Sequence, residues 1–304
     1  MEKTAKIFVA GHETMAGAAI LEKAKAEGFR TVLPVSPDLT DQKYVFEIFT
    51  SEKPDYVFIA SAKVGGIAAN SRFPAEFIFQ NIQTQTNVIH AAWKSGVKKL
   101  LYLGSSCMYP KECPQPMKEE YLMTGKLEPT NEPYAVSKIA GFIMCQSYKR
   151  QYGANFITAV PADMYGPMDD FNPETGHVLA ALIAKMHLGK TKGQQVNVWG
   201  TGSPRRDCLY VGDMADAAFF LMEQYDDAEL INIGSGQDVS IKEMASVIKD
   251  AVGFKGEIIF DTSRPDGMPR KLLETSKIDK LGWKPKVSLE QGMRQTYEWY
   301  LKNL

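Results

Sequence analysis

Residues 6–17 read KIFVAGHETMAG, an apolar, β-branched run that enters a glycine-containing turn just before a helical pattern begins. In an open α/β sheet, this succession of strand, turn and helix presents backbone N–H groups and a helix N-terminus to the pyrophosphate of a dinucleotide. We therefore predict that the turn binds a dinucleotide cofactor through Gly11, Thr14, Met15, Ala16 and Gly17.

Four further apolar runs follow this opening stretch. They read TVLPV, YVFIA, KLLYLGSS and FITAV, and longer amphipathic stretches such as 73–95 and 134–151 separate them. Parallel strands need crossover helices, and strands buried on both faces show such continuous apolar runs. The alternation therefore indicates repeated βα units. The predicted fold class is α/β, with a Rossmann-type doubly wound parallel sheet and a smaller, mostly C-terminal substrate-binding lobe.

The regular alternation of predicted strands and helices ends after about residue 162. Loops are expected at 167–176, 188–195 and 261–271, and helices at 177–187, 240–252 and 289–302, alternating with short strands. We predict that residues 1–161 form the dinucleotide-binding domain, to which segments at about 204–236 return. Residues 162–304 are then expected to form most of the substrate-binding lobe.

Composition narrows the class of protein. With 304 residues and 44% hydrophobic content the chain can bury a full core, and its formal charge of −1 argues against nucleic-acid or membrane partners, which require a basic face. Its apolar runs are too short for a signal peptide or a membrane span, so we expect a cytoplasmic protein. Cys107, Cys113, Cys145 and Cys208 lack ligand or CxxC spacing, so neither a metal site nor a disulfide is predicted.

Three residues suggest proton transfer. The segment EPTNEPYAVSKIAG places Tyr134 and Lys138 on one face of a predicted helix, with Thr130 or Asn131 as its cap. A phenol titrates near pH 10, so a nearby cation such as Lys138 is needed to stabilise its phenolate. Ser105 follows the run KLLYLG, at the carboxyl end of a predicted parallel strand, where open α/β sheets bind ligands. Its hydroxyl can then hydrogen-bond the substrate oxygen that Tyr134 protonates.

These motifs occur together in a known class of enzymes. The chain resembles the extended short-chain dehydrogenase/reductases, and in particular the family of GDP-L-fucose synthases, which are GDP-4-keto-6-deoxy-D-mannose 3,5-epimerase-4-reductases. The resemblance runs nearly end to end, through AGH, ASAKVGGIAAN, LGSSCMYP, LEPTNEPYAVSKIAG, MYGPMDDF, GHVLAALI, VWGTGSPRRD and RPDGMPRKLLETSKIDKLGW. It implies that the catalytic residues are Ser105, Cys107, Tyr134, Lys138 and His177.

Cys107 and His177 set this family apart from simple reductases. The resemblance implies that they exchange protons at the sugar carbons flanking the C4 ketone, before reduction. Protons α to a carbonyl are acidic, and inverting such a centre needs an acid and a base on opposite faces of the ring. Cys107 stands two positions after Ser105, so on a strand end it is expected to face the same side. Histidine suits proton exchange near neutral pH.

The resemblance also implies NADP(H) as the cofactor. Besides the turn residues, the expected contacts are Asp41, Ala62, Leu103, Gly104, Lys138, Pro161, Met164 and His177. NAD(H) stays open, because no arginine for a 2′-phosphate is visible, whereas Glu13, Pro34 and Ser36 occupy that region and Asp38 stands near the place of a ribose-binding acid. Thr14 also replaces the middle glycine of the reductase pattern, where close backbone approach and a positive φ are expected.

The GDP-sugar substrate is expected to contact Lys185, Trp199, Arg206, Asp266 and Lys271. Lys185 and Arg206 are the natural partners of diphosphate oxygens. Asp163 departs from the family's usual asparagine, and a carboxylate there would repel a diphosphate unless it were protonated or turned aside.

Two further functions remain open at this point. One is an epimerase or a reductase of a related GDP-4-keto sugar, a heptose or a dideoxyhexose. The other is a non-catalytic nucleotide-sugar binding protein, suggested by departures that gather at the nucleotide contacts. The family forms homodimers, and an apolar stripe including Ile139, Phe142, Ile143 and Met144 permits this here, although the same stripe could pack on its own sheet.

Overall fold

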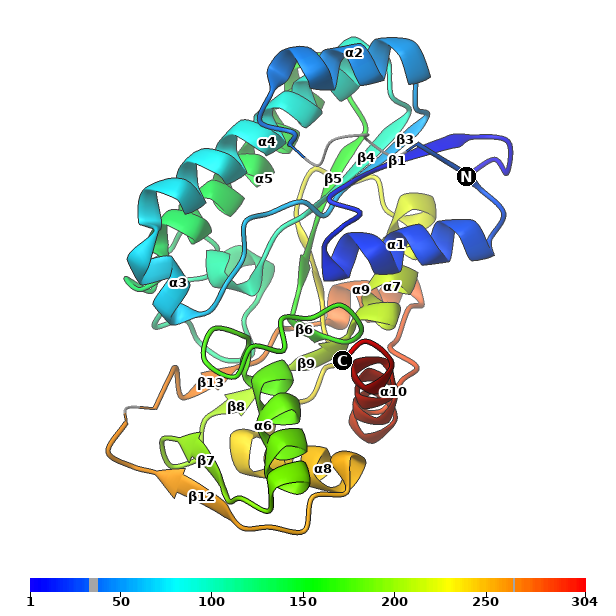
Figure 1. The fold of residues 1–304 in the computed structure, drawn as a ribbon. Helices are drawn as coiled ribbons and strands as arrows, with labels where there is room; N and C mark the ends of the chain where they lie inside the picture. Colours follow the sequence, from blue (N-terminus) through cyan, green and yellow to red (C-terminus); the bar gives the residue numbers. More distant parts are fainter. Residues whose placement is uncertain (33–37, 265) are drawn as a thin grey trace.

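The computed structural model describes residues 1–32, 38–264 and 266–304. Pro34 and Ser36, which bear on cofactor choice, lie outside the described residues. Within the described part, the polypeptide forms an upper layered domain and a lower lobe of small sheets and helices (Figure 1).

The upper domain is built on a parallel sheet. Among the described residues, its strands lie in the order β10-β5-β4-β3-β1-β2, and every neighbouring pair is parallel. Their bounds are β1 Lys6–Ala10, β2 Arg30–Val32, β3 Tyr56–Ile59, β4 Lys99–Leu103, β5 Phe156–Pro161 and β10 Ile231–Ile233. The order reverses beside β1, so the sheet is doubly wound and the predicted fold class is confirmed.

Helices cover both faces of the sheet. One face carries α2 (Gln42–Glu52), α4 (Pro74–Lys94) and α5 (Glu132–Tyr152), with the short α3 (Ile67–Arg72) beside α4 (Figure 1). The other face carries α1 (Met15–Ala26) and α7 (Val211–Gln224), with the short α9 (Ser276–Leu281) near α7 (Figure 1). The side chains of β1 alternate between the two layers. Ile7 and Val9 pack in the cluster that includes Ile20 of α1, whereas Phe8 packs in the cluster that includes Phe49 of α2.

The lower lobe contains short strands and three longer helices. The helices are α6 (Val178–Lys192), α8 (Ile241–Val252) and α10 (Leu289–Lys302). The strands are β6 Asp163–Tyr165, β7 Val196–Trp199, β8 Arg205–Arg206, β9 Cys208–Tyr210, β11 Val239–Ser240, β12 Ile258–Asp261 and β13 Arg270–Lys271. A separate core joins its helices through Leu182, Ile248 and Met293. The described residues also include two 3₁₀ turns, η1 (Ser106–Met108) and η2 (Glu119–Tyr121).

One expected loop is partly helical. Residues 188–192 continue α6, so the prediction of a loop over 188–195 is wrong for its first part. Gly189 suggests a helix end, but it is buried, and a Cβ there would come within 2.9 Å of the Phe254 ring. The glycine therefore serves close packing inside the helix. Gly193, with φ +64°, is the residue that ends α6.

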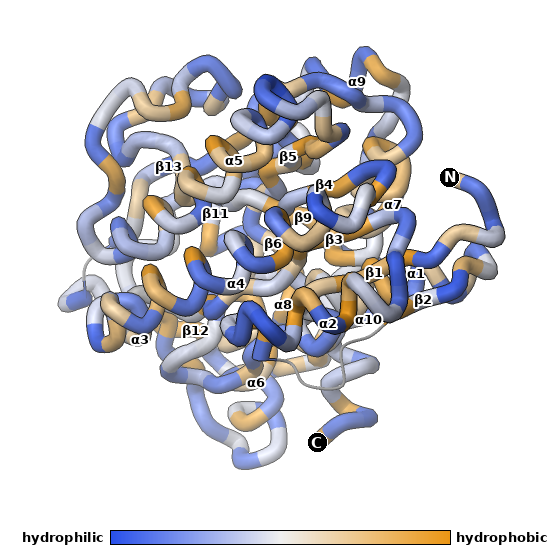
Figure 2. The backbone as a smooth tube through the Cα atoms, turned by 90° about the horizontal axis from the view of Figure 1, so that it is seen from above, coloured by the Kyte–Doolittle hydropathy of each residue, from blue (hydrophilic) through white to orange (hydrophobic). Residues whose placement is uncertain are grey.

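Hydropathy follows the layers. Viewed from above, the strands and the inner sides of the helices are hydrophobic, and the peripheral loops are mostly hydrophilic (Figure 2). Among the residues described, none of the helices combines the length and apolar character needed to cross a bilayer.

Candidate active site

The predicted cofactor contacts gather at the carboxyl edge of the sheet. Gly11 directly follows β1, Ala62 follows β3 by a few residues, and Leu103 and Pro161 end β4 and β5. Gly104 follows β4, and Met164 lies on β6. In doubly wound sheets, ligands bind outside these strand ends, next to the point where the strand order reverses.

The glycine turn is shaped by two close approaches. A Cβ on Gly17 would lie 1.9 Å from the Gly11 carbonyl oxygen, and a Cβ on Gly11 would lie 2.5 Å from the Ser61 backbone. Gly11 also has φ +85°. Only glycine fits at either position. The turn leads into the first helical residues, Met15 and Ala16, so the backbone forms the cradle that a pyrophosphate requires.

Thr14 adopts a different geometry from the one expected at its position. Its φ is −86°, so the expectation of a positive φ there is wrong. Thr14 is instead the N-cap of α1: its Oγ1 accepts a hydrogen bond from Gly17 N at 3.1 Å and donates one to Gly11 O at 2.7 Å. The hydroxyl therefore stabilises the turn in place of a glycine.

The acidic residues near the expected ribose site make local contacts. The Asp41 side chain caps α2 by accepting from Tyr44 N at 3.2 Å. Asp38 accepts from both the backbone N–H and the hydroxyl of Thr40, at 3.0 and 2.6 Å, and these hydrogen bonds lower the pKa of its carboxyl. Glu13 lies 3.5 Å from the His12 ring.

Ser105, Tyr134 and Lys138 converge beside β4. Lys138 is buried, its Nζ donates to Leu103 O at 2.9 Å and lies 6.0 Å from the centre of the Tyr134 ring, and burial lowers its pKa to about 8. Burial, followed by the nearby Cys107, raises the pKa of Tyr134, although the Ser105 hydroxyl opposes this. The expected lowering of the Tyr134 pKa by Lys138 is not among the effects that act on this phenol, and burial dominates them. The phenol carries its proton at neutral pH and can donate it.

Cys107 reaches the site by a different route from the one predicted. It lies in η1 and not on the strand, which ends at Leu103, so the expectation based on strand alternation is wrong. The chain turns because the Ser105 hydroxyl accepts from Cys107 N at 3.2 Å. The Cys107 Sγ nevertheless faces the site, where it accepts from Asn131 Nδ2 at 3.3 Å and from Lys271 Nζ at 3.7 Å. Two donors therefore point at one sulfur, at the edge of the site.

Asp163 lies among the cations expected to bind diphosphate. Its Oδ1 accepts from Lys271 Nζ at 3.0 Å and from Ser106 Oγ at 3.3 Å, and its Oδ2 lies 3.8 Å from Arg206 Nε. Burial alone would raise the pKa of the Asp163 carboxyl, but Lys271 and then Arg206 hold it below its usual range. The carboxylate is therefore neither protonated nor turned aside, because ion pairs neutralise it.

His177 stands at the N-cap position of α6 without making a side-chain cap hydrogen bond. Its imidazole Nδ1 lies 3.8 Å from Asp169 Oδ1, and its side chain is 50% exposed. Asp169 raises the pKa of His177 above its usual value, and the effect outweighs burial. The negative charge of Asp163 acts in the same direction and the positive charge of Lys271 opposes it.

A second group of predicted residues lies in the lower lobe. Trp199, at the end of β7, is 60% exposed, and its ring lies 5.8 Å from Lys185 Nζ and 5.2 Å from the Arg264 guanidinium. Asp266 accepts from Thr201 N and Oγ1, at 2.9 and 2.7 Å, so it fixes the turn after β7. Arg206 and Lys271, by contrast, pair with Asp163 beside Cys107.

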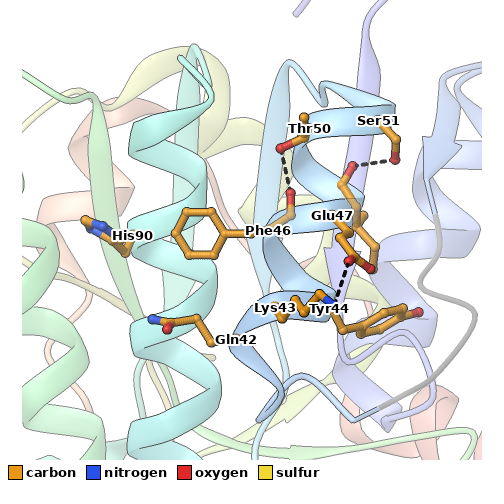
Figure 3. Close-up of a pocket in the computed structure, with 9 residues that line it drawn as sticks. Gln42, Lys43, Tyr44, Phe46, Glu47, Thr50, Ser51 and His90 are labelled. Atoms are coloured by element: carbon orange, nitrogen blue, oxygen red, sulfur yellow. Dashed lines mark hydrogen bonds and ion pairs between the residues drawn. The ribbon is translucent and has the colours of Figure 1, made fainter.

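One hollow of the described surface lies away from this site. It is formed by the outer side of α2, with Phe46, and by His90 of α4 (Figure 3). None of the predicted site residues lines it. A second, small hollow is lined by Ser106, Asp163 and Lys271, the last of which contacts Cys107. Among the described residues, no group of three or more His, Cys, Asp or Glu side chains could hold a metal ion.

Sequence reasoning missed three residues of this region. The sequence indicates Asn131 only as a helix cap, yet its amide contacts the Cys107 sulfur. No sequence signal points to Asp169 or Arg264, which face His177 and Trp199. The motif MYGPMDDF contains Asp169, but nothing in its spacing shows that the carboxylate turns back toward His177.

A doubly wound sheet with Ser, Tyr and Lys at its carboxyl edge defines a nucleotide-dependent oxidoreductase of the short-chain dehydrogenase/reductase class. The model of the NAD dependent epimerase/dehydratase family matches residues 7–234. The chain belongs to that family and, within it, to the family of GDP-L-fucose synthases.

Named relatives match almost end to end. GDP-L-fucose synthase 1 of Arabidopsis thaliana is 53% identical over 307 residues, which cover 100% of this chain and 95% of the relative. GDP-L-fucose synthase of Escherichia coli K12 is 45% identical, covering 98% of this chain and 97% of the relative.

Solved structures of enzymes that act on GDP-sugars are similar to this chain over nearly its full length. A GDP-6-OMe-4-keto-L-xylo-heptose reductase from Campylobacter jejuni has a TM-score of 0.94 and 39% identity, and the match covers 100% of this chain and 99% of that one. A GDP-L-fucose synthetase from Naegleria fowleri bound to NADP has a TM-score of 0.92 and 28% identity, with 100% and 96% coverage.

Proposed function

We propose that the protein converts GDP-4-keto-6-deoxy-D-mannose to GDP-L-fucose, by epimerisation at C3 and C5 followed by NADP(H)-dependent reduction at C4. The observation that carries this proposal is that Cys107 and His177 lie beside the same site as Ser105, Tyr134 and Lys138. The names of the relatives that are 45–53% identical support it. One site would then serve both proton exchange and hydride transfer.

In the epimerisation, Cys107 acts as the base. Its thiolate, held by Asn131 and Lys271, takes the proton from the carbon next to the C4 ketone, and the electron pair of that C–H bond moves to the ketone oxygen as an enolate. His177, protonated beside Asp169, then returns a proton to the opposite face of the carbon while the electron pair moves back. Water then takes the proton from the Cys107 thiol and returns one to the half-exposed His177, so that a second cycle can follow at the other carbon flanking the ketone.

In the reduction, Tyr134 donates its proton to the C4 oxygen. When bound, the dinucleotide supplies the hydride that this carbon receives. The Ser105 hydroxyl hydrogen-bonds the same oxygen, and Lys138 stabilises the phenolate that Tyr134 becomes. The raised pKa of Tyr134 fits this direction, since the phenol must begin the step protonated.

The turn at Gly11 and Gly17 fits the pyrophosphate of this cofactor, because its close backbone packing, which leaves no room for a Cβ at either glycine, leads directly into the N-terminus of α1. A relative from Naegleria fowleri that carries NADP in its crystal structure supports the phosphorylated form. We propose the same cofactor-contacting residues that the sequence predicts. Parallel calorimetric titrations with NADPH and NADH test the preference. Unmeasurable binding of both would leave the hydride step untenable and favour a non-catalytic binding protein.

We place the substrate on the side of the site that faces the lower lobe, away from the parallel sheet. Arg206 and Lys271 are placed to neutralise the diphosphate, while Lys185, Trp199 and Asp266 of the lower lobe would hold the nucleoside end. The division into a dinucleotide-binding domain at 1–161, with returning segments at about 204–236, and a mostly substrate-binding lobe at 162–304 belongs to this proposal.

A second candidate substrate is a GDP-4-keto heptose. The Campylobacter jejuni structures favour it, since they include a GDP-mannoheptose C4 reductase that is 41% identical with a TM-score of 0.91. A GDP-L-colitose synthase from Yersinia pseudotuberculosis is 36% identical, and it supports a GDP-4-keto dideoxyhexose as a further alternative substrate. Competition between the keto-deoxymannose and keto-heptose substrates, compared by kcat/KM, decides between them.

A homodimer through α4 and α5 is also proposed. Phe142 of the expected apolar stripe packs into the chain's own core, with Ile139 and Ile143 against it. The surface that remains on these two helices includes Phe79 and Tyr152. Multi-angle light scattering should give twice the monomer mass, and a monomer at micromolar concentration would contradict the assignment. A cytoplasmic location stays a prediction from the sequence.

The proposed reaction is tested by incubating the purified protein with GDP-4-keto-6-deoxy-D-mannose and NADPH. NADPH should be consumed as GDP-L-fucose is released, with both measured in one sample. A folded protein that produces neither change would contradict the proposal.

A further inference from the structure

The segment between β6 and α6 is tied to itself by its own polar groups. Asp170 accepts from Asn172 N at 3.0 Å, and Asn172 Oδ1 accepts from Glu174 N and Thr175 N at 2.9 and 3.2 Å. Gly176 N donates to Asn172 O at 3.0 Å. These bonds give the segment a defined path, so that the two residues at its ends, Asp169 and His177, have a fixed relation.

An aromatic contact anchors the same segment to the C-terminal helix. The Phe171 ring lies 6.0 Å from Trp299 at an interplanar angle of 20°, and 4.8 Å from Tyr300. Both partners belong to α10, which packs in the core of the lower lobe. The loop is therefore held from outside as well as from within.

Asp169 is the unusual member of the segment. Its side chain is only 4% exposed, and Oδ2 is buried without a hydrogen-bond partner in the described part of the chain. A buried carboxylate is costly unless a cation compensates it. The nearest candidate is the His177 imidazole, whose Nδ1 is 3.8 Å from Oδ1 and whose side chain remains half exposed toward the site.

The other charged groups facing His177 do not replace Asp169. Asp163, on β6, also favours the imidazolium, but it is already paired with Lys271 and Arg206. Lys271, on β13, faces His177 as well and opposes its protonation. The charge of Asp163 is therefore neutralised by its own cations. Asp169 is the carboxylate that pairs with His177.

We propose that Asp169 is a positioning residue for His177: its carboxylate orients Nδ1 and keeps the imidazole protonated, which leaves Nε2–H as the proton donor to the sugar carbon. This role rests on the proposed function in giving His177 the epimerisation step. Asp169 touches neither substrate nor cofactor in this scheme. It acts by fixing the ring and its charge, as carboxylates do for histidines in other active sites.

The direct test is the titration of His177 by NMR. The chain has four histidines, so ¹³C-histidine labelling gives a resolvable set, and His177→Gln assigns the signal. The wild-type pKa should lie above 6.5, the ordinary value. In Asp169→Asn it should fall by about one unit or more, since an opposite charge within ion-pair distance is lost. A wild-type value at or below 6.5, or an unchanged value in Asp169→Asn, would overturn the proposal.

Asp170→Asn is the matched control. It removes one charge from the same segment but from a carboxylate that makes loop hydrogen bonds and does not face His177. It should leave the titration of His177 unchanged. If Asp170→Asn lowers the pKa as much as Asp169→Asn does, general disturbance of the loop explains the effect and the specific role fails. Because the wild-type value alone can contradict the proposal, it stays testable even if Asp169→Asn does not fold.

Isotope exchange supplies the functional readout. In D₂O, Asp169→Asn should lose epimerisation at lower pH than wild type, because its histidine loses the proton earlier. Oxidation of GDP-L-fucose with NADP⁺, which uses Tyr134, should be retained. If the NMR shift occurs and neither variant nor wild type makes GDP-L-fucose, only the proposed function fails. If wild type is active and Asp169→Asn matches it in both assays, only the positioning role fails.

Discussion

Tyr134 and Cys107 lie within one site, yet the proposed chemistry assigns them to different steps. Replacing Tyr134 by Phe removes the proton donor for the C4 oxygen and leaves the Cys107 environment of Asn131 and Lys271 in place. NADPH oxidation with the keto-sugar should slow by about 10²–10⁴-fold in Tyr134→Phe. Single-turnover absorbance at the NADPH band measures this, and deuterium exchange at C3 and C5 should persist.

Cys107→Ser is the complementary variant. A hydroxyl ionises far less readily than a thiol, so exchange at C3 and C5 should be lost while oxidation of GDP-L-fucose by NADP⁺ remains. If each substitution abolished both steps equally in folded protein, the division of labour between the two residues would be wrong.

The ion pairs of Asp163 are expected to stabilise the fold and to weaken substrate binding. In Asp163→Asn the amide no longer neutralises Lys271 and Arg206, so both cations become available to a diphosphate. KM for the GDP-sugar should fall by about tenfold, which corresponds to about 1.4 kcal/mol. The free energy of unfolding should fall too, by about 1–3 kcal/mol, because a buried lysine loses its partner.

Steady-state kinetics and urea unfolding measure these two effects separately. Lys271→Met is the paired control: it removes the cation itself and should raise KM. A rise of KM in Asp163→Asn would mean that the carboxylate helps to bind the substrate.

At the level of single residues, the sequence was informative where chemistry depends on local spacing. Tyr134 and Lys138 share a helix turn, and Ser105 follows a strand, so their meeting is predictable. Asn131 and Asp169 act through tertiary contacts, with Cys107 of η1 and with His177 after the 167–176 loop. No local sequence pattern predicts that these segments meet. The position of Cys107 in a 3₁₀ turn also depends on a hydrogen bond from its own N–H to Ser105.

Among the secondary-structure elements, the start of α1 makes the clearest prediction. Thr14→Ala removes the hydroxyl that accepts from Gly17 N and donates to Gly11 O. The free energy of unfolding should drop by about 1 kcal/mol, the usual cost of losing an N-cap. NADPH should bind more weakly, because the same hydroxyl holds the turn.

Thr14→Ser keeps the hydroxyl and is the matched control. Chemical denaturation and calorimetry should place it close to wild type. Equal losses in the Ala and Ser variants would show that the methyl group, and not the cap, matters at this position.

The longer elements were predictable to within a few residues because their apolar periodicity is strong. The stretches expected at 73–95 and 240–252 correspond to α4 (Pro74–Lys94) and α8 (Ile241–Val252). The strands β8, β11 and β13 have two residues each and pair only after distant segments meet, so no local signal marks them. The loop expected at 188–195 was wrong in its first part for a related reason, since the packing of Gly189 inside α6 depends on Phe254, far away in the sequence.

For the whole molecule, Asp207 connects segments that are distant in sequence. It is 2% exposed and accepts from Ser235 N at 2.8 Å, from Ser235 Oγ at 2.6 Å and from Leu273 N at 3.4 Å. Burial raises the pKa of this carboxyl to about 6, from 3.8. Between these two pH values the folded state binds more protons than the unfolded state, so the free energy of unfolding falls as pH rises from 3.8 to about 6.

Asp207→Asn should remove this contribution. The difference in unfolding free energy between wild type and Asp207→Asn should therefore shift against wild type by up to about 3 kcal/mol across that range. Urea unfolding at several pH values measures it, and exposed Asp250→Asn controls for the loss of one negative charge. Parallel pH profiles for wild type and Asp207→Asn would contradict the raised pKa.

The central claim is that one site performs both epimerisation and reduction, and it is tested most directly by running the complete reaction in D₂O. NMR and mass spectrometry of the product, from wild-type protein with GDP-4-keto-6-deoxy-D-mannose and NADPH, should show GDP-L-fucose carrying deuterium at C3 and C5. A 4-reduced product that keeps the D-manno configuration, with hydrogen at both carbons, would contradict the claim and leave a simple reductase.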